Sequence, residues 1–566
     1  MNDRARTAPA TETVTRRTPR TSWLLLLAGV IVALGASYAA YTLAGYSWAQ
    51  VVEYDTPFLT AANGELKTTR PPLADSIPGA TPHRTVLVLI DGLTDETSRK
   101  MASIEALRKR GSDVALTVPQ PSLSYPTWTT ILTGAPPQIS GVTTNWYEKR
   151  VPLETLMDVA AESGRSVVVA GPTDIETLYV ASEVASTSFT DWTEGDYVTD
   201  TIVDDALTLA AEKNADFVFA LFPDVDEAGH SKGASSEEYA AVAAQVDADL
   251  ARLIEGLDDG NTVFVVLPDH GHVAVGGHGG WEDPVIHTFA AFAGPGVEPG
   301  RAEARLKDIA PTVALLAGFQ APSGAAGVVI DGLLSDSNGE AQSLDTERAR
   351  RFEAAYSQTV AGSAMPAEIA DRERLKEDRA DRLPVALGLA VLAIAVLVAI
   401  GVASWRALAA SLAGALAYLA VYNGLFFIAH RYAWSLSTFN EESMIQAFFN
   451  GRMIEAVVAW LLGCAVASEV YLMLRPEPKG TDAGFTVGWL SLGVTTALVI
   501  QVVLGLQVAW FLWQWGAGTV WRLPDLMWGF KYDLDLIQLT AIAGVALLGP
   551  AVTYLFGRFH PRVAKA

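Results

Sequence analysis

Residues 262–280 read TVFVVLPDHGHVAVGGHGG, and the first six of them form a short run rich in valine. A β-branched, apolar run of this length is typical of a strand buried on both faces of a sheet. One aspartate and three histidines follow within the ten residues from Asp269 to His278. Ligand-type side chains directly after a buried strand indicate a site at the edge of that sheet.

The same kind of run occurs four more times earlier in the chain. These runs are TVLVLI (85–90), DVALTV (113–118), SVVVAG (166–171) and FVFALF (217–222). Stretches with helical patterning lie between them, at 94–110, 152–164, 199–214 and 235–258. Alternating strands and helices predict an α/β domain with three layers, in which helices cover both faces of a mostly parallel sheet.

Carboxylates and imidazoles follow several of these runs at the point where each predicted strand ends. Asp91 directly follows the first run, and Asp226 and His230 follow the fourth. Ligands of open parallel sheets bind beyond the carboxyl ends of the strands. We therefore expect these three side chains to converge with those of Asp269 and His270.

Histidine is concentrated in the same part of the chain, because five of the eight histidines lie between residues 230 and 287. Imidazole together with carboxylate oxygen suits zinc, whereas calcium and magnesium prefer oxygen ligands alone. A pair of zinc ions is the interpretation that we favour, although other divalent metals are compatible with the set. Any one of these histidines, taken alone, could equally be a structural residue with hydrogen bonds.

Ser124 lies in the stretch PSLSYPTWTTILTG (121–134), which follows a predicted strand and then takes on helical character. Pro126 suits the first turn of a helix, and Ser124 just before it could act as the N-cap. That end of a helix also favours negative charge. From these residues alone, Ser124 is either a simple cap or a reactive hydroxyl beside an anion site.

Six motifs occur in the order typical of the alkaline phosphatase superfamily. They are Asp91-Gly92, SYPTWTTILTG (124–134), Asn145 within SGVTTNWY, DEAGH (226–230), DHG (269–271) and GGHGG (276–280). Over roughly residues 84–320 the chain most closely resembles the type I phosphodiesterase/nucleotide pyrophosphatase branch of that superfamily. The resemblance implies an alkaline-phosphatase-like fold.

The resemblance also implies roles for individual residues. One zinc ion would be surrounded by Asp91, Ser124, Asp269 and His270, and the other would be held by Asp226, His230 and His278. Ser124 would be the nucleophile, passing through a phosphoseryl intermediate, and Asn145 with a nearby backbone N–H would steady a phosphoryl oxygen. No ligand role is assigned to His272 or His287.

The chain departs from the motifs of two related groups of enzymes, and these differences narrow the range of expected substrates. Sulfatases of the superfamily carry an arginine at the position where this chain has Trp128, and the Asp-Ser-Ala context of alkaline phosphatases proper is absent. A phosphodiester substrate is therefore favoured over a sulfate ester or a monoester. Four aromatic residues could line a base-stacking wall or could equally belong to the core: Trp128, Trp146, Tyr147 and Trp281.

Apolar runs outside this domain are long enough to cross a bilayer, which takes about 20 residues. Six such runs lie at 23–44, 385–405, 407–429, 453–474, 485 to about 510 and 536–557. The first is preceded by a basic leader that contains Arg4, Arg6, Arg16, Arg17 and Arg20 against Asp3 and Glu12. Basic residues favour the cytoplasmic side, so we expect both termini there and the α/β domain outside. A cleaved signal peptide with small residues around Ala36–Ala40 is the alternative.

These features divide the chain into seven parts. We expect a leader (1–22), a first span (23–48), a linker (49–84), a catalytic domain (85–340), a charged connector (341–384), a five-helix membrane domain (385–557) and a tail (558–566). The net charge of −23 argues against a nucleic acid polymer as partner. The single cysteine, Cys464, excludes an intrachain disulfide.

The sequence thus predicts a membrane-bound, zinc-dependent phosphodiesterase whose substrate is a nucleotide or lipid-headgroup diester. The layout, one span before the domain and several after it, resembles that of GPI ethanolamine phosphate transferases. A phosphoethanolamine-type transferase acting on a lipid or glycan is therefore one alternative. A membrane protein that binds phosphorylated ligands without turnover is another.

Overall fold

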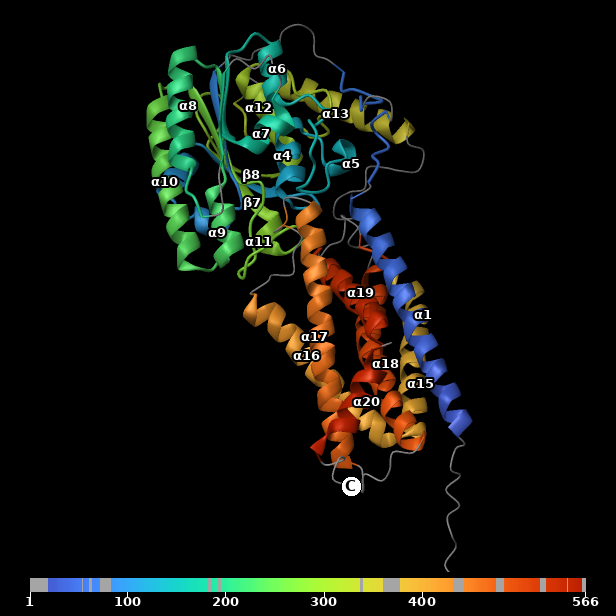
Figure 1. Cartoon of the computed structure of the whole chain (residues 1–566). Coiled ribbons are helices and arrows are strands. Elements are labelled where there is room, and N and C mark those ends of the chain that lie inside the picture. Colours follow the sequence, from blue (N-terminus) through green and yellow to red (C-terminus); the bar gives the residue numbers. More distant parts are fainter. Residues whose placement is uncertain are drawn as a thin grey trace, which may run out of the picture.

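The chain has an α/β part stacked on the end of a long helical bundle (Figure 1). The computed structural model describes residues 19–52, 54–60, 64–71, 83–180, 186–191, 195–335, 339–359, 377–430, 437, 439, 442–474, 483–519, 526–546 and 548–561. The predicted leader and tail lie mostly outside these described residues.

Eight strands form one mixed sheet in the order β4-β3-β5-β1-β6-β7-β2-β8. They are β1 (Arg84–Ile90), β2 (Ser112–Thr117), β3 (Val167–Pro172), β4 (Ser186–Thr190), β5 (Phe217–Phe222), β6 (Thr262–Leu267), β7 (His287–Ala293) and β8 (Gly300–Arg305). Strand β7 runs antiparallel to both β2 and β6, and the other pairs are parallel. The central trio β5-β1-β6 therefore ends at one edge.

Helices cover both faces of the sheet, as expected from the alternating pattern. The helices of this part are α2 (Asp95–Ser98), α3 (Ala102–Arg110), α4 (Ser124–Thr133), α5 (Pro137–Ser140), α6 (Leu156–Glu162), α7 (Thr173–Tyr179), α8 (Thr199–Lys213), α9 (Asp224–Lys232), α10 (Glu237–Leu257), α11 (Asp283–Ile286), α12 (Ile309–Ala317) and α13 (Gly339–Thr359), with a 3-10 turn at Leu306–Asp308. Helices α8 and α10 lie on one face, whereas α4, α6 and α12 lie on the other (Figure 1).

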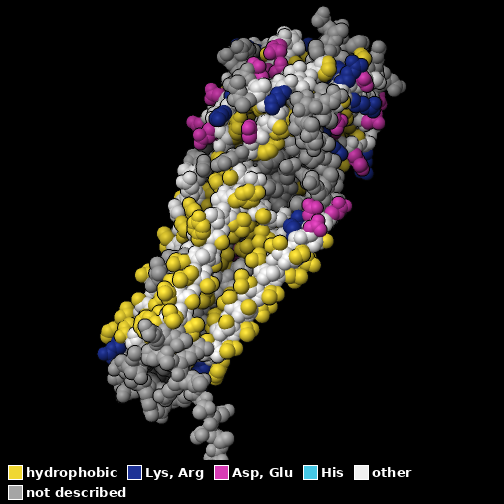
Figure 2. Space-filling view, turned by 90° about the vertical axis from the view of Figure 1, so that its right-hand side faces the viewer, with side chains coloured by type: hydrophobic (Ala, Val, Ile, Leu, Met, Phe, Trp, Pro, Cys, Tyr) yellow, Lys and Arg dark blue, Asp and Glu magenta, His cyan; other side chains and the backbone are white. Residues whose placement is uncertain are grey.

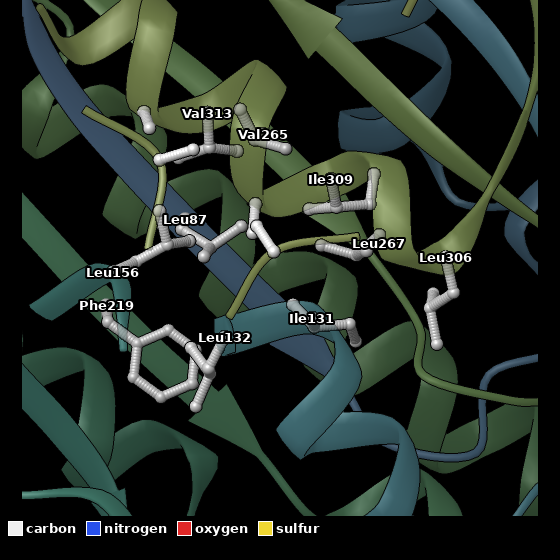
Figure 3. Packing of buried hydrophobic residues seen from close by; sticks show 14 of the residues in the cluster. Leu87, Ile131, Leu132, Leu156, Phe219, Val265, Leu267, Leu306, Ile309 and Val313 are labelled. Atoms are coloured by element: carbon white, nitrogen blue, oxygen red, sulfur yellow. The ribbon is translucent and has the colours of Figure 1, made fainter. Parts of the chain in front are cut away.

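Two apolar cores lie on the two faces of the sheet, and β1 contributes side chains to both. Leu87 and Leu89 point into the core beneath α4 and α12, while Val86, Val88 and Ile90 point into the core beneath α8 and α10. Figure 3 shows part of the first core. A strand buried on both faces needs apolar residues at every position, which explains the unbroken runs in the sequence.

The predicted fold class is confirmed, with differences in individual elements. All five predicted strands are present, but β4, β7 and β8 were not predicted, and the predicted helix 94–110 is divided into α2 and α3. Helix α13, in the predicted connector, packs into the first core through Ala341 and Phe352. It is also tied to the predicted linker (49–84) by a buried ion pair, in which the side chains of Arg70 and Asp345 are 2.6 Å apart.

The helical bundle consists of α1 (Pro19–Val52), α15 (Arg379–Ala403), α16 (Trp405–Gly424) continued by a π-helix (Leu425–Ala429), α17 (Glu442–Leu474), α18 (Ala483–Trp515), α19 (Leu526–Ala546) and α20 (Gly549–Phe559). Among the described residues, five helices are long and apolar enough to cross a membrane. The sixth predicted span, 536–557, is instead shared between α19 and α20. Hydrophobic side chains cover the visible face of the bundle (Figure 2).

Candidate metal centre

Three adjacent strands deliver acidic residues and histidines to one edge of the sheet. Strand β1 lies between β5 and β6, and all three run parallel. Asp91 directly follows β1, α9 begins two residues after β5, and Asp269 and His270 follow β6. The convergence expected from the sequence therefore results from neighbouring strands ending at one level.

Helix α9 holds two candidate ligands one turn apart. Asp226 and His230 lie on the same helix face, with His230 Nε2 3.1 Å from Asp226 Oδ2. The Nε2 atom of His278, from the glycine-rich loop, lies 3.2 Å from that of His230. Nδ1 of His278 lies 2.7 Å from the carbonyl oxygen of Ser122. Because a carbonyl only accepts, Nδ1 carries the proton and Nε2 keeps a lone pair for a metal.

A second group lies beside the first and shares Asp226 with it. His270 Nε2 lies 3.1 Å from Asp269 Oδ2 and 3.4 Å from Asp91 Oδ1. Nδ1 of His270 faces the Gly271 carbonyl oxygen at 3.2 Å, so this imidazole also leaves Nε2 unprotonated. Its ring stacks on that of His278 with centroids 3.7 Å apart. The two groups therefore form one continuous cluster.

The cluster has an excess of buried negative charge, which a bound cation would balance. Burial, together with the charges of Asp269 and Asp226, raises the pKa of Asp91 well above its usual value. Asp91 Oδ1 is buried and makes no hydrogen bond within the described part of the chain. No lysine or arginine among the described residues lines the adjoining cavity. The donor set of carboxylates and imidazoles therefore fits divalent metal ions.

His272, which the sequence left without a role, lies inside the cluster. Its Nε2 is 2.6 Å from Asp226 Oδ1, and its Nδ1 accepts a hydrogen bond of 3.1 Å from the backbone N–H of Gly277. Burial lowers the pKa of His272 to about 4, so the ring is neutral near pH 7. Its single proton is then on Nε2, and His272 donates to Asp226. His287, by contrast, is exposed beside Asp283 and lies outside the cluster.

Ser124 is the first residue of α4, but its side chain does not cap the helix. Leu123 occupies the N-cap position, and no side-chain capping bond is present. Ser124 Oγ lies 3.4 Å from His270 Nε2 and accepts a 3.4 Å hydrogen bond from Asn145 Nδ2. Asn145 Oδ1 in turn accepts from the backbone N–H of Tyr125 at 3.0 Å. The hydroxyl therefore faces the histidine–aspartate cluster, with one amide group beside it.

A cavity of about 550 Å³ opens over these groups. Of the four aromatic residues considered from the sequence, only Trp128 lines it, together with Tyr125, which was not predicted. Trp281 belongs to the core, Tyr147 packs against the same core, and Trp146 stacks on Trp48 of α1. Tyr125 could have been noticed from its place directly after Ser124.

The fold and the cluster together define an α/β domain in which a buried serine faces a group of carboxylates and imidazoles that could hold a metal ion. Residues 85–290 match the family model described as Type I phosphodiesterase / nucleotide pyrophosphatase, which confirms the predicted resemblance over the α/β part. The search of curated proteins gave no match.

Similar solved structures share low sequence identity with this chain. An alkaline phosphatase, PafA, is 14% identical, with a TM-score of 0.38 over 45% of this chain and 100% of its own. A murine ectonucleotide pyrophosphatase/phosphodiesterase 5 in complex with AMP is 13% identical, with a TM-score of 0.36 over 42% of this chain and 96% of its own. A 2-O GAG sulfatase is 18% identical, with a TM-score of 0.36 over 44% and 73%.

Proposed function

We propose that the protein is a metal-dependent phosphodiesterase that uses Ser124 as its nucleophile. The observation that carries the proposal is the position of the Ser124 hydroxyl, 3.4 Å from His270 Nε2 and free of a capping bond. The family match over residues 85–290 supports the reaction class, a phosphoric ester hydrolase. The geometry of the cluster supports the particular roles.

We assign two zinc ions to this cluster, one at each side of it. The first would be held by Asp91, Ser124, Asp269 and His270. The second would be held by Asp226, His230 and His278, and the Nε2 atoms of these two histidines face one another. When bound, such ions lower the pKa of a hydroxyl and offset the negative charge of a phosphoryl group. A charge-balancing role agrees with the raised pKa of Asp91, whose carboxyl group is buried beside the carboxylates of Asp269 and Asp226.

The chain's own residues then carry out a two-step exchange at phosphorus. Ser124 Oγ bonds to phosphorus while the bond to the leaving alkoxide breaks, and the serine proton ends on the released alcohol. Asn145 Nδ2 has a second hydrogen to offer a phosphoryl oxygen, and the Tyr125 N–H, which donates to Asn145 Oδ1, holds the amide in that orientation. Water then attacks phosphorus, the bond to Oγ breaks, and the serine hydroxyl is restored.

We place this reaction outside the cytoplasmic membrane, with both termini in the cytoplasm. Support comes from the basic leader and from the five helices that are long and apolar enough to span a bilayer. The substrate is a phosphodiester, from a nucleotide or from a lipid headgroup. If a second alcohol replaces water in the last step, the same residues make a transferase.

The test is turnover of bis(p-nitrophenyl) phosphate by the purified full chain loaded with zinc. Ser124→Ala should lower kcat by at least about 1000-fold and still bind zinc, because its nucleophile is lost while the other ligands remain. Ser140→Ala, which removes another buried hydroxyl from this domain, is the control and should retain activity. His278→Ala should instead lose zinc, measured by metal analysis.

Three results would change the assignment. Near-normal turnover by Ser124→Ala would exclude this serine as nucleophile. Turnover of the monoester p-nitrophenyl phosphate at a higher rate than the diester would exclude the diesterase. Hydrolysis of neither compound by the zinc-loaded protein would favour a binding protein without turnover.

A further inference from the structure

The catalytic cavity is not formed by the α/β part alone. Ser437 and Met444, which lie beyond the α/β part in the sequence, line the same cavity as Asp91 and Ser124. Ser437 is buried, and its Oγ accepts a 3.2 Å hydrogen bond from the backbone N–H of His278. Met444 lies in the first turn of α17. One wall of the candidate active site therefore comes from the helical bundle.

The bundle also holds the chain segment that carries Asn145. Trp146 stacks on Trp48 of α1, with ring centroids 5.9 Å apart and an interplanar angle of 6°. Thr143 donates a 3.1 Å hydrogen bond to the carbonyl oxygen of Val51. An apolar cluster surrounds this junction and joins α1, α17 and α19: Val51, Phe426, Phe439, Ile445, Phe530 and Leu534. The cavity and the bundle are thus joined in a fixed arrangement.

If α17 crosses the bilayer, as we propose, its length brings the cavity to about the level of the lipid headgroups. This helix has 33 residues, so it is about 50 Å long, whereas the hydrocarbon layer is about 30 Å thick and the headgroup regions extend it to about 40–45 Å. Met444 lies at the end of α17 nearest the α/β part and is 47% exposed. A lipid beside this turn would have its phosphate near the cavity and its chains beside the bundle.

We infer that the substrate is a bilayer lipid whose headgroup is joined through a phosphodiester. The headgroup enters the cavity past Met444, while the acyl chains stay among the apolar surfaces of the bundle. Asp174 and Glu227 add further carboxylates to the lining, which suits a zwitterionic headgroup with an ammonium group better than an anionic one. This inference rests on the proposed function and names the substrate class.

The test compares the same headgroup with and without its acyl chains. Full-length protein in nanodiscs is given phosphatidylethanolamine, phosphatidylcholine or phosphatidylglycerol, and separately glycerophosphoethanolamine, glycerophosphocholine and p-nitrophenyl thymidine 5′-phosphate. Products are identified by mass spectrometry. We expect at least one zwitterionic lipid to be cleaved at least about tenfold faster than its deacylated counterpart and faster than the anionic lipid.

The outcomes separate this inference from the proposed function. Cleavage of the nucleotide ester or the deacylated compounds at rates equal to or above those of the lipids would overturn the lipid assignment. Hydrolysis of bis(p-nitrophenyl) phosphate alone would also overturn the lipid assignment, but it would still support the proposed phosphodiesterase function. Absence of turnover of every compound would overturn both the lipid assignment and the proposed phosphodiesterase function.

Two methionines of α17 provide a matched pair of variants. Met444→Gln makes the wall of the cavity polar, whereas Met473→Gln makes the same change at the opposite end of the helix, where the side chain is 66% exposed. For Met444→Gln we expect the ratio of lipid to bis(p-nitrophenyl) phosphate turnover to fall about tenfold, because an apolar contact with the lipid is lost. Equal ratios in the two variants would contradict a lipid beside Met444.

Discussion

The three buried imidazoles of the cluster differ in which nitrogen carries the proton. His270 and His278 each face a carbonyl oxygen with Nδ1, which leaves Nε2 available to a metal. Nδ1 of His272 accepts a hydrogen bond from the backbone N–H of Gly277, so its Nε2 is protonated and donates to Asp226. Of these three, His270 and His278 are therefore suited to bind metal, as His230 also is proposed to do, and His272 is suited to orient a carboxylate that binds it.

Two substitutions of His272 separate its two hydrogen bonds. Gln can still donate to Asp226 from a position similar to Nε2, whereas Asn can accept from Gly277 but reaches Asp226 poorly. We expect His272→Asn to weaken zinc binding about 10–100-fold and His272→Gln to weaken it less, because the donor to the carboxylate orients the metal ligand. Competition with a chromophoric chelator measures both affinities. Equal, complete loss of zinc in both variants would instead make His272 a direct ligand.

Single residues show how far sequence reasoning reaches at this scale. The seven predicted ligands lie together because each follows a strand end or a recognisable motif, and their roles stay predictions until metal is measured. His272 could not be placed, because its role depends on the Gly277 backbone N–H, which no residue type or spacing specifies. The choice between cap and reactive hydroxyl for Ser124 likewise needed the start of α4 to be known within one residue.

Helix α9 brings two candidate ligands together and lets the imidazole of His272 approach its backbone. Gly229 lies between Asp226 and His230, and a Cβ at this position would lie 2.6 Å from the His272 ring. Packing against His272 therefore favours glycine at this position, although glycine has a low helix propensity. The motif DEAGH combines two ligands with the space that His272 occupies.

Gly229→Ala tests this close approach. Alanine favours the helical conformation by about 1 kcal/mol relative to glycine, so propensity alone would stabilise α9. We expect the opposite result, a loss of zinc affinity of about tenfold or more, because the added methyl group displaces His272 from Asp226. Gly300→Ala is the control, since a Cβ there meets nothing within 4 Å. Zinc titrations that give the same affinity for both variants would show that His272 has room to move.

Strands were predicted well where their sequences are continuously apolar, and poorly where apolar residues are mixed with alanine, glycine or charged residues. Four of the five predicted strands, β1, β3, β5 and β6, were found because strands buried on both faces leave unbroken apolar runs. Strand β2 is fully buried only at alternate positions, but its sequence is still largely apolar. Strand β7 reads HTFAAFA and β8 reads GRAEAR, and their alanines, together with the glycine and charges of β8, give weak strand propensity. Both are strands because neighbours in the sheet pair with them, which is tertiary information.

At the scale of the whole molecule, contacts between distant parts of the sequence determine the surroundings of the site. Apolar runs predicted a helical bundle, but not that Trp146 would stack on Trp48 or that Ser437 would contact His278. The division of the last predicted span also escaped prediction, because hydropathy does not register the break between α19 and α20. Packing of the α/β part on the bundle is thus the least predictable feature, and it contacts Trp146 and Thr143, which lie directly after Asn145 and two residues before it.

The stack of Trp146 on Trp48 gives a test of that packing. Trp48→Ala removes the ring on which the segment carrying Asn145 rests, while the metal ligands are untouched. Because small displacements of a positioning group can cost up to about 100-fold in rate, we expect kcat for bis(p-nitrophenyl) phosphate to fall by about tenfold to 100-fold with zinc content unchanged. Trp48→Phe should restore part of the rate, and Trp405→Ala, at the far end of the bundle, should have no effect. A Trp48→Ala variant with normal kcat would mean that the α/β part holds Asn145 without help from the bundle.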